Sequence, residues 1–222
     1  QFADELEGAK DFNAALHDLV VREIKAHKRI IFNGNNYAPE WAEEAEKRGL
    51  LNLKNAAEAL PHFADKKNIE LFERNKVFTE REVVTRTDIM LENYSKVLNI
   101  EALTMIDMAK QDIYPAVNGY IAELCSVIAA KRAVSEKLAC GADETLAEKL
   151  STMNEAFAAA MKKLEKDLSE MPAGEGPASQ KMAHVVVPDM EAVRALADSM
   201  EKLCSSDYWP YPTYTDLLYS IR

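Results

Sequence analysis

Apolar residues recur at helical spacing through most of the chain, and the longest such pattern covers Thr79–Ala139. Thr79 and Glu82 have the spacing of a capping box, so we expect a helix to begin directly after Thr79. Pro115 lies inside the pattern, and proline lacks a backbone donor and clashes with the preceding turn. We therefore predict two collinear or bent helices that meet near residues 112–115. The apolar positions lie three, four or seven residues apart along one helical face, and they include Val83, Met90, Val97, Ile106, Ile113, Tyr120, Leu124 and Val127.

The residues before Thr79 predict one long helix and two short ones. Asn33–Asn36 should end the long helix, because Asn and Gly tolerate the left-handed backbone of tight turns. Pro39 suits the first turn of a helix, and Gly49 suits the left-handed position that follows one. The predicted helices run from Asp4 or Asp11 to Ile30, from Glu40 to Arg48, and from Asn52 to Leu60, where Pro61 follows.

The residues after Ala139 predict two more main helices, separated by a linker. Asp143 and Asp189 are each expected to cap the helix that follows them. Between these helices, residues 172–188 (PAGEGPASQKMAHVVVP) are rich in turn formers and predict a long linker. The chain closes on an aromatic tail with the sequence SSDYWPYPTYTDLLYSIR.

Composition favours helices over strands. Seven Gly and eight Pro are few for 222 residues, and 48% hydrophobic residues suffice for a substantial core. We predict an all-α fold, an elongated bundle of long antiparallel helices with short helices and the aromatic C-terminal tail. Residues 1–78 should hold the first helix, the short helices and their loops, and residues 79–222 the long-helix bundle, together forming one structural unit.

Charge and cysteine content limit the partners and the compartment. A formal charge of -10 repels phosphate backbones and anionic lipids, so we expect neither nucleic acid nor a membrane as partner. The sequence shows neither a run of roughly 20 apolar residues nor a secretory signal pattern at its start, which predicts a cytoplasmic protein. Three cysteines without CxxC spacing predict buried free thiols.

Residues with catalytic or metal-binding potential are scattered. Di-metal sites in helical bundles use Glu-x-x-His pairs, and the sequence has none, which weighs against a ferritin-like metalloenzyme. Glu23 and His27 lie four apart and predict a surface pair. His62 and His184 have no identifiable nucleophile at a motif spacing. We therefore predict no catalytic, cofactor-binding or metal-binding residue in this chain.

The aromatic tail is the best candidate for an interaction surface. Amphipathic aromatic residues are enriched where one protein surface docks on another. Two alternatives stay open: the tail folds back over the core of its own domain, or it contacts another subunit or domain. The candidate interface residues are Trp209, Tyr211 and Tyr214.

A family resemblance rests on several sequence blocks. Lys28–Tyr37 (KRIIFNGNNY), followed by Glu40-Trp41 and Glu44–Leu50, resembles the region that follows the catalytic core of type III glutamine synthetases. Further blocks are similar to this region in the same order, and they are Lys67–Glu73, Thr79–Glu82, Asn99–Ala102, Met108-Ala109 with Pro115-Ala116, and Trp209–Tyr214.

The resemblance implies a parent enzyme that ligates ammonia to glutamate with ATP and divalent Mg or Mn, in a barrel between subunits of a ring-based oligomer. The family's metal, glutamate and nucleotide ligands belong to segments upstream of this region. Asn33–Asn36 is similar to the glutamate-binding loop in composition alone, because Tyr37 and Ala38 replace its His-containing continuation. No catalytic residue is carried over.

The resemblance therefore predicts a non-catalytic C-terminal helical region, inactive by itself. It should support the catalytic barrel and homo-oligomer assembly, with the first helix and the aromatic tail as contact surfaces. The alternative is an independent helical-bundle adaptor that binds a partner helix in a groove.

Overall fold

The computed structural model describes residues 2–212 and 214–219, and every regular element in these ranges is helical. The predicted all-α class is confirmed. By its internal contacts the chain divides into two compact units, Gln1–Lys54 and Asn55–Arg222. This boundary lies earlier than the predicted one at residue 78, because the short helices α4 and α5 pack on the start of α6.

The first unit consists of short helices. They are α1 (Phe2–Glu7), α2 (Phe12–Ala26), a 3-10 turn (Lys28–Ile30) and α3 (Pro39–Lys47). Asp11 caps α2 by accepting a hydrogen bond from the backbone N of Ala14 at 3.1 Å. Pro39 begins α3 and Gly49 follows it with a φ of 74°, so both predictions are confirmed. The predicted end of the first helix at Ile30 is wrong, because α geometry stops at Ala26.

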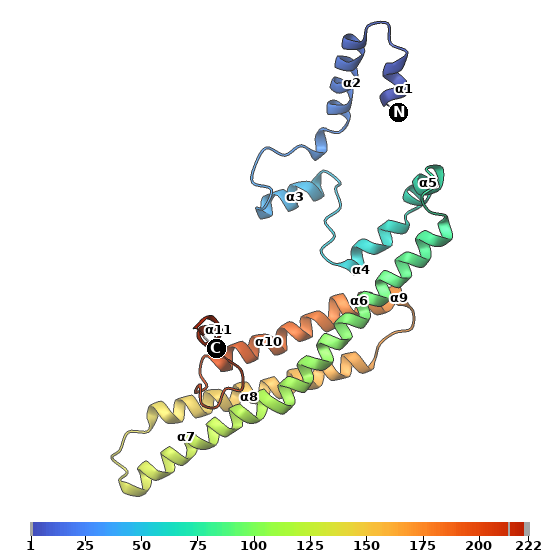
Figure 1. Cartoon of the computed structure of the whole chain (residues 1–222). Coiled ribbons are helices and arrows are strands. Elements are labelled where there is room, and N and C mark those ends of the chain that lie inside the picture. The colour runs from blue at the N-terminus through green and yellow to red at the C-terminus, as the bar shows by residue number, and fades with distance from the viewer. Residues whose placement is uncertain (1, 213, 220–222) are drawn as a thin grey trace. The chain divides into compact units, whose positions relative to one another are not determined.

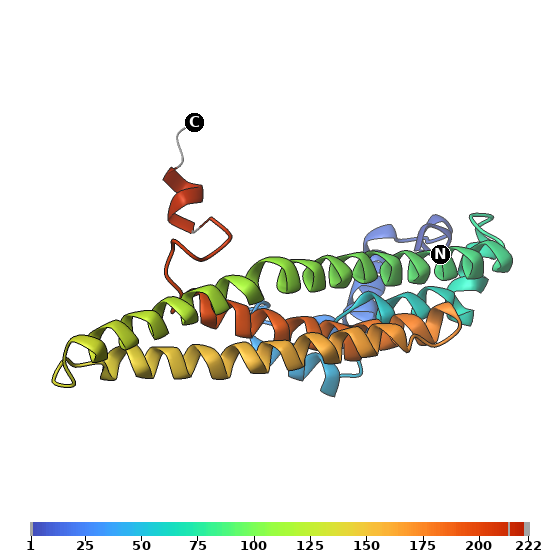
Figure 2. The same cartoon turned by 90° about the horizontal axis from the view of Figure 1, so that it is seen from below.

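The second unit is built around one long rod. Its parts are α6 (Glu80–Met108), a π-helical turn (Ala109–Ile113) and α7 (Tyr114–Val134). α8 (Gly141–Ser169) returns antiparallel to this rod, and α9 (Glu175–Lys181), a second π turn (Met182–Val186) and α10 (Val187–Glu201) run back along it, as Figures 1 and 2 show. At the start of the rod lie α4 (Ala56–Ala59), a 3-10 turn (Leu60–Ala64) and α5 (Lys66–Arg74), and the tail carries α11 (Tyr214–Tyr219).

The core of the second unit lies between the rod, α8 and α10. Burying a large apolar side chain stabilises the fold by about 1.5–3 kcal/mol. Side chains from all three elements are fully buried, and the largest are Phe157, Leu150, Leu164, Met200, Val117, Val186 and Val193. Burial of this core fixes the arrangement of the long helices, because neighbouring helical faces cover one another.

Two prolines follow the two π turns. Pro115 is the second residue of α7 and Pro188 the second residue of α10. The missing donor of a proline is tolerated in the first turn of a helix, and a π turn before it widens the backbone where an α turn would clash. The two predicted helices therefore meet at Pro115 through a π turn that keeps the rod continuous.

The predicted linker at residues 172–188 is wrong. The chain is helical from Glu175 onward, because Met182 and Val186 are buried in the core. The predicted helix caps are also wrong. Asp143 lies in the first turn of α8 and Asp189 in that of α10, where each pairs with a lysine of another helix.

Candidate interaction surface

The aromatic tail packs against the core of the second unit. Trp209 and Tyr211 are half-buried against the cluster of core residues. The ring of Tyr208 lies on Tyr120 of α7, with 5.4 Å between the ring centroids. Gly119 makes this approach possible, because a Cβ atom there would lie 3.2 Å from Cδ1 of Tyr208. The tail is therefore seated on α7 by close aromatic contacts.

One hydrogen bond fastens the tail to the first π turn. The hydroxyl of Tyr211 donates to Oδ2 of Asp112 at 2.6 Å. Burial of the ring, and then the hydrogen bond and charge of Asp112, raise the pKa of Tyr211 to about 12. The phenol therefore stays protonated as a donor at neutral pH.

A groove of about 620 Å³ lies between α6, α10 and the tail. Its floor is apolar and its rim carries Glu101, Arg194, Asp198 and Glu201. Arg194 pairs with Asp198 at 3.6 Å, so the rim is acidic on balance. The apolar lining residues are Ile100, Met105, Met108, Ala109, Ile113, Phe157, Met190, Val193, Ala197, Trp209 and Tyr211.

The structure brings two of the three candidate interface residues together. Trp209 and Tyr211 lie against the core and line the groove, so for them the tail folds back on its own domain. Tyr214 begins α11, but its side chain lies outside the described residues. Contact of this tail with another subunit stays a prediction.

Asp112 was not recognised from the sequence, because its partner is 99 residues away and no local motif marks the pair. Tyr208 differs, since its position among the tail aromatics already marked it for burial or contact.

The scattered histidines form isolated pairs. Nε2 of His27 lies 3.3 Å from a carboxylate oxygen of Glu23 on the surface of α2, which confirms the predicted surface pair. His62 lies 3.0 Å from Asp65, and His184 lies 3.5 Å from Glu58. Within residues 2–212 and 214–219, no three His, Cys, Asp or Glu residues gather as a metal site would require.

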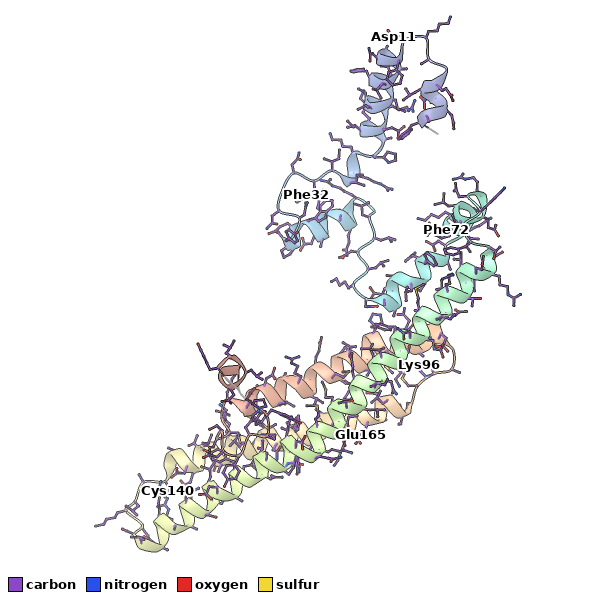
Figure 3. The ribbon with its side chains drawn as sticks, in the orientation of Figure 1. Asp11, Phe32, Phe72, Lys96, Cys140 and Glu165 are labelled. Atoms are coloured by element: carbon purple, nitrogen blue, oxygen red, sulfur yellow. The ribbon has the colours of Figure 1, made fainter. Side chains whose placement is uncertain are left out.

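The three cysteines are free thiols, as expected, but they are not all buried. Cys140 is buried in the loop between α7 and α8, where Figure 3 labels it. Cys204 is half-buried, and this burial raises the pKa of its thiol. Cys125 is exposed on α7, contrary to the expectation, because only one face of that helix is covered.

The sequence block with the clearest family resemblance forms a compact cluster in the first unit. The rings of Phe32 and Trp41 stack with 4.6 Å between centroids. Arg48 lies over Trp41 and donates to the backbone oxygen of Ile31 at 2.8 Å. An added Cβ at Gly34 would lie only 2.7 Å from Cε1 of Phe32, so a larger residue here would force the Phe32 ring to shift. These residues fold the loop after α2 onto α3.

The long rod contains a more apolar stretch than the sequence pattern suggested. By length and composition alone, the continuous helix Glu80–Val134 could cross a membrane, and only 11% of its most apolar window is buried inside the structure. Such a helix is weak evidence for a membrane protein, because the core helices of soluble proteins meet the same criteria.

Known glutamine synthetases resemble this chain over nearly its whole length. A glutamine synthetase from Butyrivibrio fibrisolvens is 35% identical over 208 residues, which cover 92% of this chain and 30% of that protein. A type-3 glutamine synthetase from Dictyostelium discoideum is 29% identical over 220 residues, which cover 94% of this chain and 29% of that protein. A glutamine synthetase from Bacteroides fragilis is 27% identical, and the alignment covers 93% of this chain and 29% of that protein. The chain thus spans about 30% of the length of these relatives.

A family model of a glutamine synthetase domain also matches this chain. The model of the glutamine synthetase C-terminal domain matches residues 15–132, which is more than half of the chain. This match includes α2, the Phe32–Trp41 cluster and nearly all of the long rod. The chain therefore belongs to the glutamine synthetase C-terminal domain family.

Proposed function

We propose that this chain is the non-catalytic C-terminal helical region of a type III glutamine synthetase and that it supports the catalytic portion and the oligomer. One observation carries the proposal: the relatives align over 92–94% of this chain while the chain spans only 29–30% of them. Most of each relative therefore has no counterpart here, and the proposal places the chemistry in that remaining part.

The whole protein would be an ATP-dependent ligase of nitrogen metabolism, working in the cytoplasm. Its ATP and its Mg or Mn would bind in the catalytic portion, and that portion would be the first partner of this chain. The long rod suits a supporting role, because a continuous helix of 55 residues braced by α8 and α10 resists bending. The groove with its acidic rim and the tail beside it would serve as contact surfaces.

The test compares three forms of the protein. The full-length protein, a form that lacks this chain, and this chain alone are assayed for glutamine formation from glutamate, ammonia and ATP with magnesium. We expect activity in the first, strongly reduced activity and a smaller oligomer in the second, and none in the third. Robust turnover by this chain alone would contradict the proposal, and so would full activity and full assembly without it.

The family match does not favour the alternative of an independent adaptor. An adaptor would have to bind its partner without a catalytic portion. The assay of the form that lacks this chain distinguishes a supporting region from an adaptor, because loss of an adaptor would leave catalysis and assembly intact.

A further inference from the structure

A hollow of about 650 Å³ lies in the first unit, beside the loop that follows α2. Figure 3 labels Phe32 in this loop. Among the described residues, those that line the hollow include three cations and no acid, although the whole chain has a formal charge of -10. We call this place the basic hollow, and its lining residues are Lys28, Arg29, Ile31, Phe32, Asn33 and Arg48.

Arg48 is held in place at one side of the basic hollow. Its Nε donates to Oε1 of Glu44 at 2.6 Å, and its Nη1 donates to the backbone oxygen of Ile31 at 2.8 Å. The guanidinium also lies over the ring of Trp41, 5.7 Å from its centroid. Within the described part of the chain, Nη2 makes no hydrogen bond. Arg48 therefore offers a planar donor group whose position is fixed before any ligand arrives.

Lys28 and Arg29 supply the charge that is not balanced. They are exposed neighbours in the 3-10 turn after α2, and neither forms an ion pair within residues 2–212 and 214–219. Glu44 balances the charge of Arg48. The surplus positive charge of the basic hollow is therefore that of Lys28 and Arg29 together.

A phosphate monoester fits this charge and this lining. Its phosphate carries a charge of about −1.5 to −2 at pH 7 and three strong acceptor oxygens, which matches two unbalanced cations and the free N–H groups of Arg48. A single carboxylate would balance only one of the cations. The side-chain amide of Asn33 is a further donor, and Ile31 and Phe32 offer apolar contact to the organic part of a ligand.

The surroundings of the basic hollow favour a small anion over a nucleic acid. α3, whose C-cap residue is Arg48, carries four acidic residues. The screening length is about 10 Å at 0.1 M salt, so a small anion inside the hollow responds mainly to the cations there. A strand that extends beyond the hollow would be repelled by the acidic surface around it. The four acids of α3 are Glu40, Glu43, Glu44 and Glu46.

We propose that the basic hollow binds a small phosphate monoester. Lys28, Arg29 and Arg48 bind the phosphate, and the organic part lies along Ile31 and Phe32. This site goes beyond the supporting role proposed above, because that role requires no ligand.

Isothermal titration calorimetry of the 222-residue chain with phenyl phosphate tests the site. We expect saturable binding of one molecule per chain. Lys28→Gln combined with Arg29→Gln should weaken this binding at least about tenfold, because charge-assisted hydrogen bonds are lost. Both side chains are exposed, and thermal unfolding of the variant verifies that the fold is intact.

Lys10→Gln combined with Lys25→Gln is the matched control. It removes the same amount of charge from exposed residues of the first unit that do not line the basic hollow. The affinity for phenyl phosphate should stay nearly unchanged.

Three further ligands test the class of ligand. Inorganic phosphate lacks the organic part, and benzoate has the same ring with a single negative charge. A single-stranded oligonucleotide carries phosphates that extend beyond the hollow. Each of them should bind more weakly than phenyl phosphate.

Three results would overturn the inference: no saturable binding of phenyl phosphate, binding that survives the double substitution of Lys28 and Arg29, or binding of any of the three other ligands that is at least as tight. The proposed function would survive each of these results, because its assays measure glutamine formation and assembly rather than occupancy of this site.

Discussion

The hydroxyl of Tyr211 and the carboxylate of Asp112 join the tail to the first π turn through a hydrogen bond of 2.6 Å. Asp112 lies where the long rod departs from α geometry, and Tyr211 lies just before α11. Tyr211 and Ile113, the residue that follows Asp112, both line the groove beside α6. The seating of the tail and the shape of the groove therefore depend on the same contact.

Tyr211→Phe should loosen the tail without disturbing the rod. Loss of one hydrogen bond to a charged acceptor should lower the free energy of unfolding by about 1 kcal/mol or slightly more. The pKa of Tyr211 is raised to about 12 in the folded state, against about 10 in an unfolded chain. The contribution of the bond is thus fully present below about pH 10 and is lost as the pH rises toward 12.

Urea unfolding at pH 8 and at pH 11 measures this effect. The difference between the native protein and Tyr211→Phe should shrink at the higher pH. Tyr219→Phe serves as control, because Tyr219 is 75% exposed and its loss should change little. Equal stability of both variants at pH 8 would mean that the Tyr211 bond contributes nothing.

Lys163→Met should destabilise the contact between α8 and α10. Nζ of Lys163 pairs with Asp189 and also lies 3.2 Å from Oδ2 of Asp167. Asp189 is only 8% exposed, and its Oδ2 has no hydrogen-bond partner among the described residues. Removing the lysine leaves a nearly buried carboxylate without its counter-charge, which is costly.

The melting temperature measures this cost, and an exposed ion pair on α10 serves as the comparison. We expect Lys163→Met to lower it by several degrees. Arg194→Met removes an exposed pair with Asp198 on one helix and should lower it far less. If both substitutions have the same effect, the burial of Asp189 is not what makes the Lys163 pair important.

Features of the fold that depend on neighbouring residues could be predicted from the sequence. The capping box at Thr79 and the turn glycine at position 49 act within four or five residues of the chain, so local pattern suffices. Asp143 and Asp189 looked like helix caps for the same local reason. Their actual partners, Lys131 and Lys163, come from other helices and are invisible in a local pattern.

The segment at residues 172–188 shows how tertiary burial overrides composition. Gly174 and Gly176 suggested a linker, and Gly174 does adopt a φ of 90° just before α9. The residues beyond it are helical because Ser179, Met182 and Val186 are buried. In the candidate surface, aromatic content marked Trp209 and Tyr211, whereas the position of Asp112 beneath the tail required the fold.

Thr79→Ala tests the start of the long rod. The backbone N of Glu82 donates to Oγ1 of Thr79 at 3.3 Å, and the backbone N of Thr79 donates to Oε2 of Glu82 at 2.8 Å. Loss of an N-cap side chain costs about 1 kcal/mol. The backbone hydrogen bond from Thr79, and then its hydroxyl, lower the pKa of Glu82. The contribution of the box is therefore present above the unfolded pKa of Glu82 and is lost as the pH falls.

Urea unfolding at pH 7 and at pH 3 measures the role of this cap. The effect of Thr79→Ala should be smaller at pH 3. Thr152→Ala is the control, because Thr152 is exposed in the middle of α8 and donates only to the backbone oxygen of Glu148. An equal loss for the two threonines at pH 7 would argue against the capping box.

A double-mutant cycle on Asn118 and Asn154 tests what aligns α7 with α8. Asn154 is 2% exposed, and its Nδ2 donates to Oδ1 of Asn118 at 3.1 Å and to the backbone oxygen of Tyr114 at 3.3 Å. A polar pair in an apolar interface disfavours shifted registers, which would leave the amides unpaired. We expect Asn154→Ala to cost about 2 kcal/mol and the coupling with Asn118→Ala to be about 1 kcal/mol. Asn118→Ala combined with Thr152→Ala should be additive within about 0.5 kcal/mol. Additivity of the two asparagine substitutions would show that apolar packing alone sets the register of this helical hairpin.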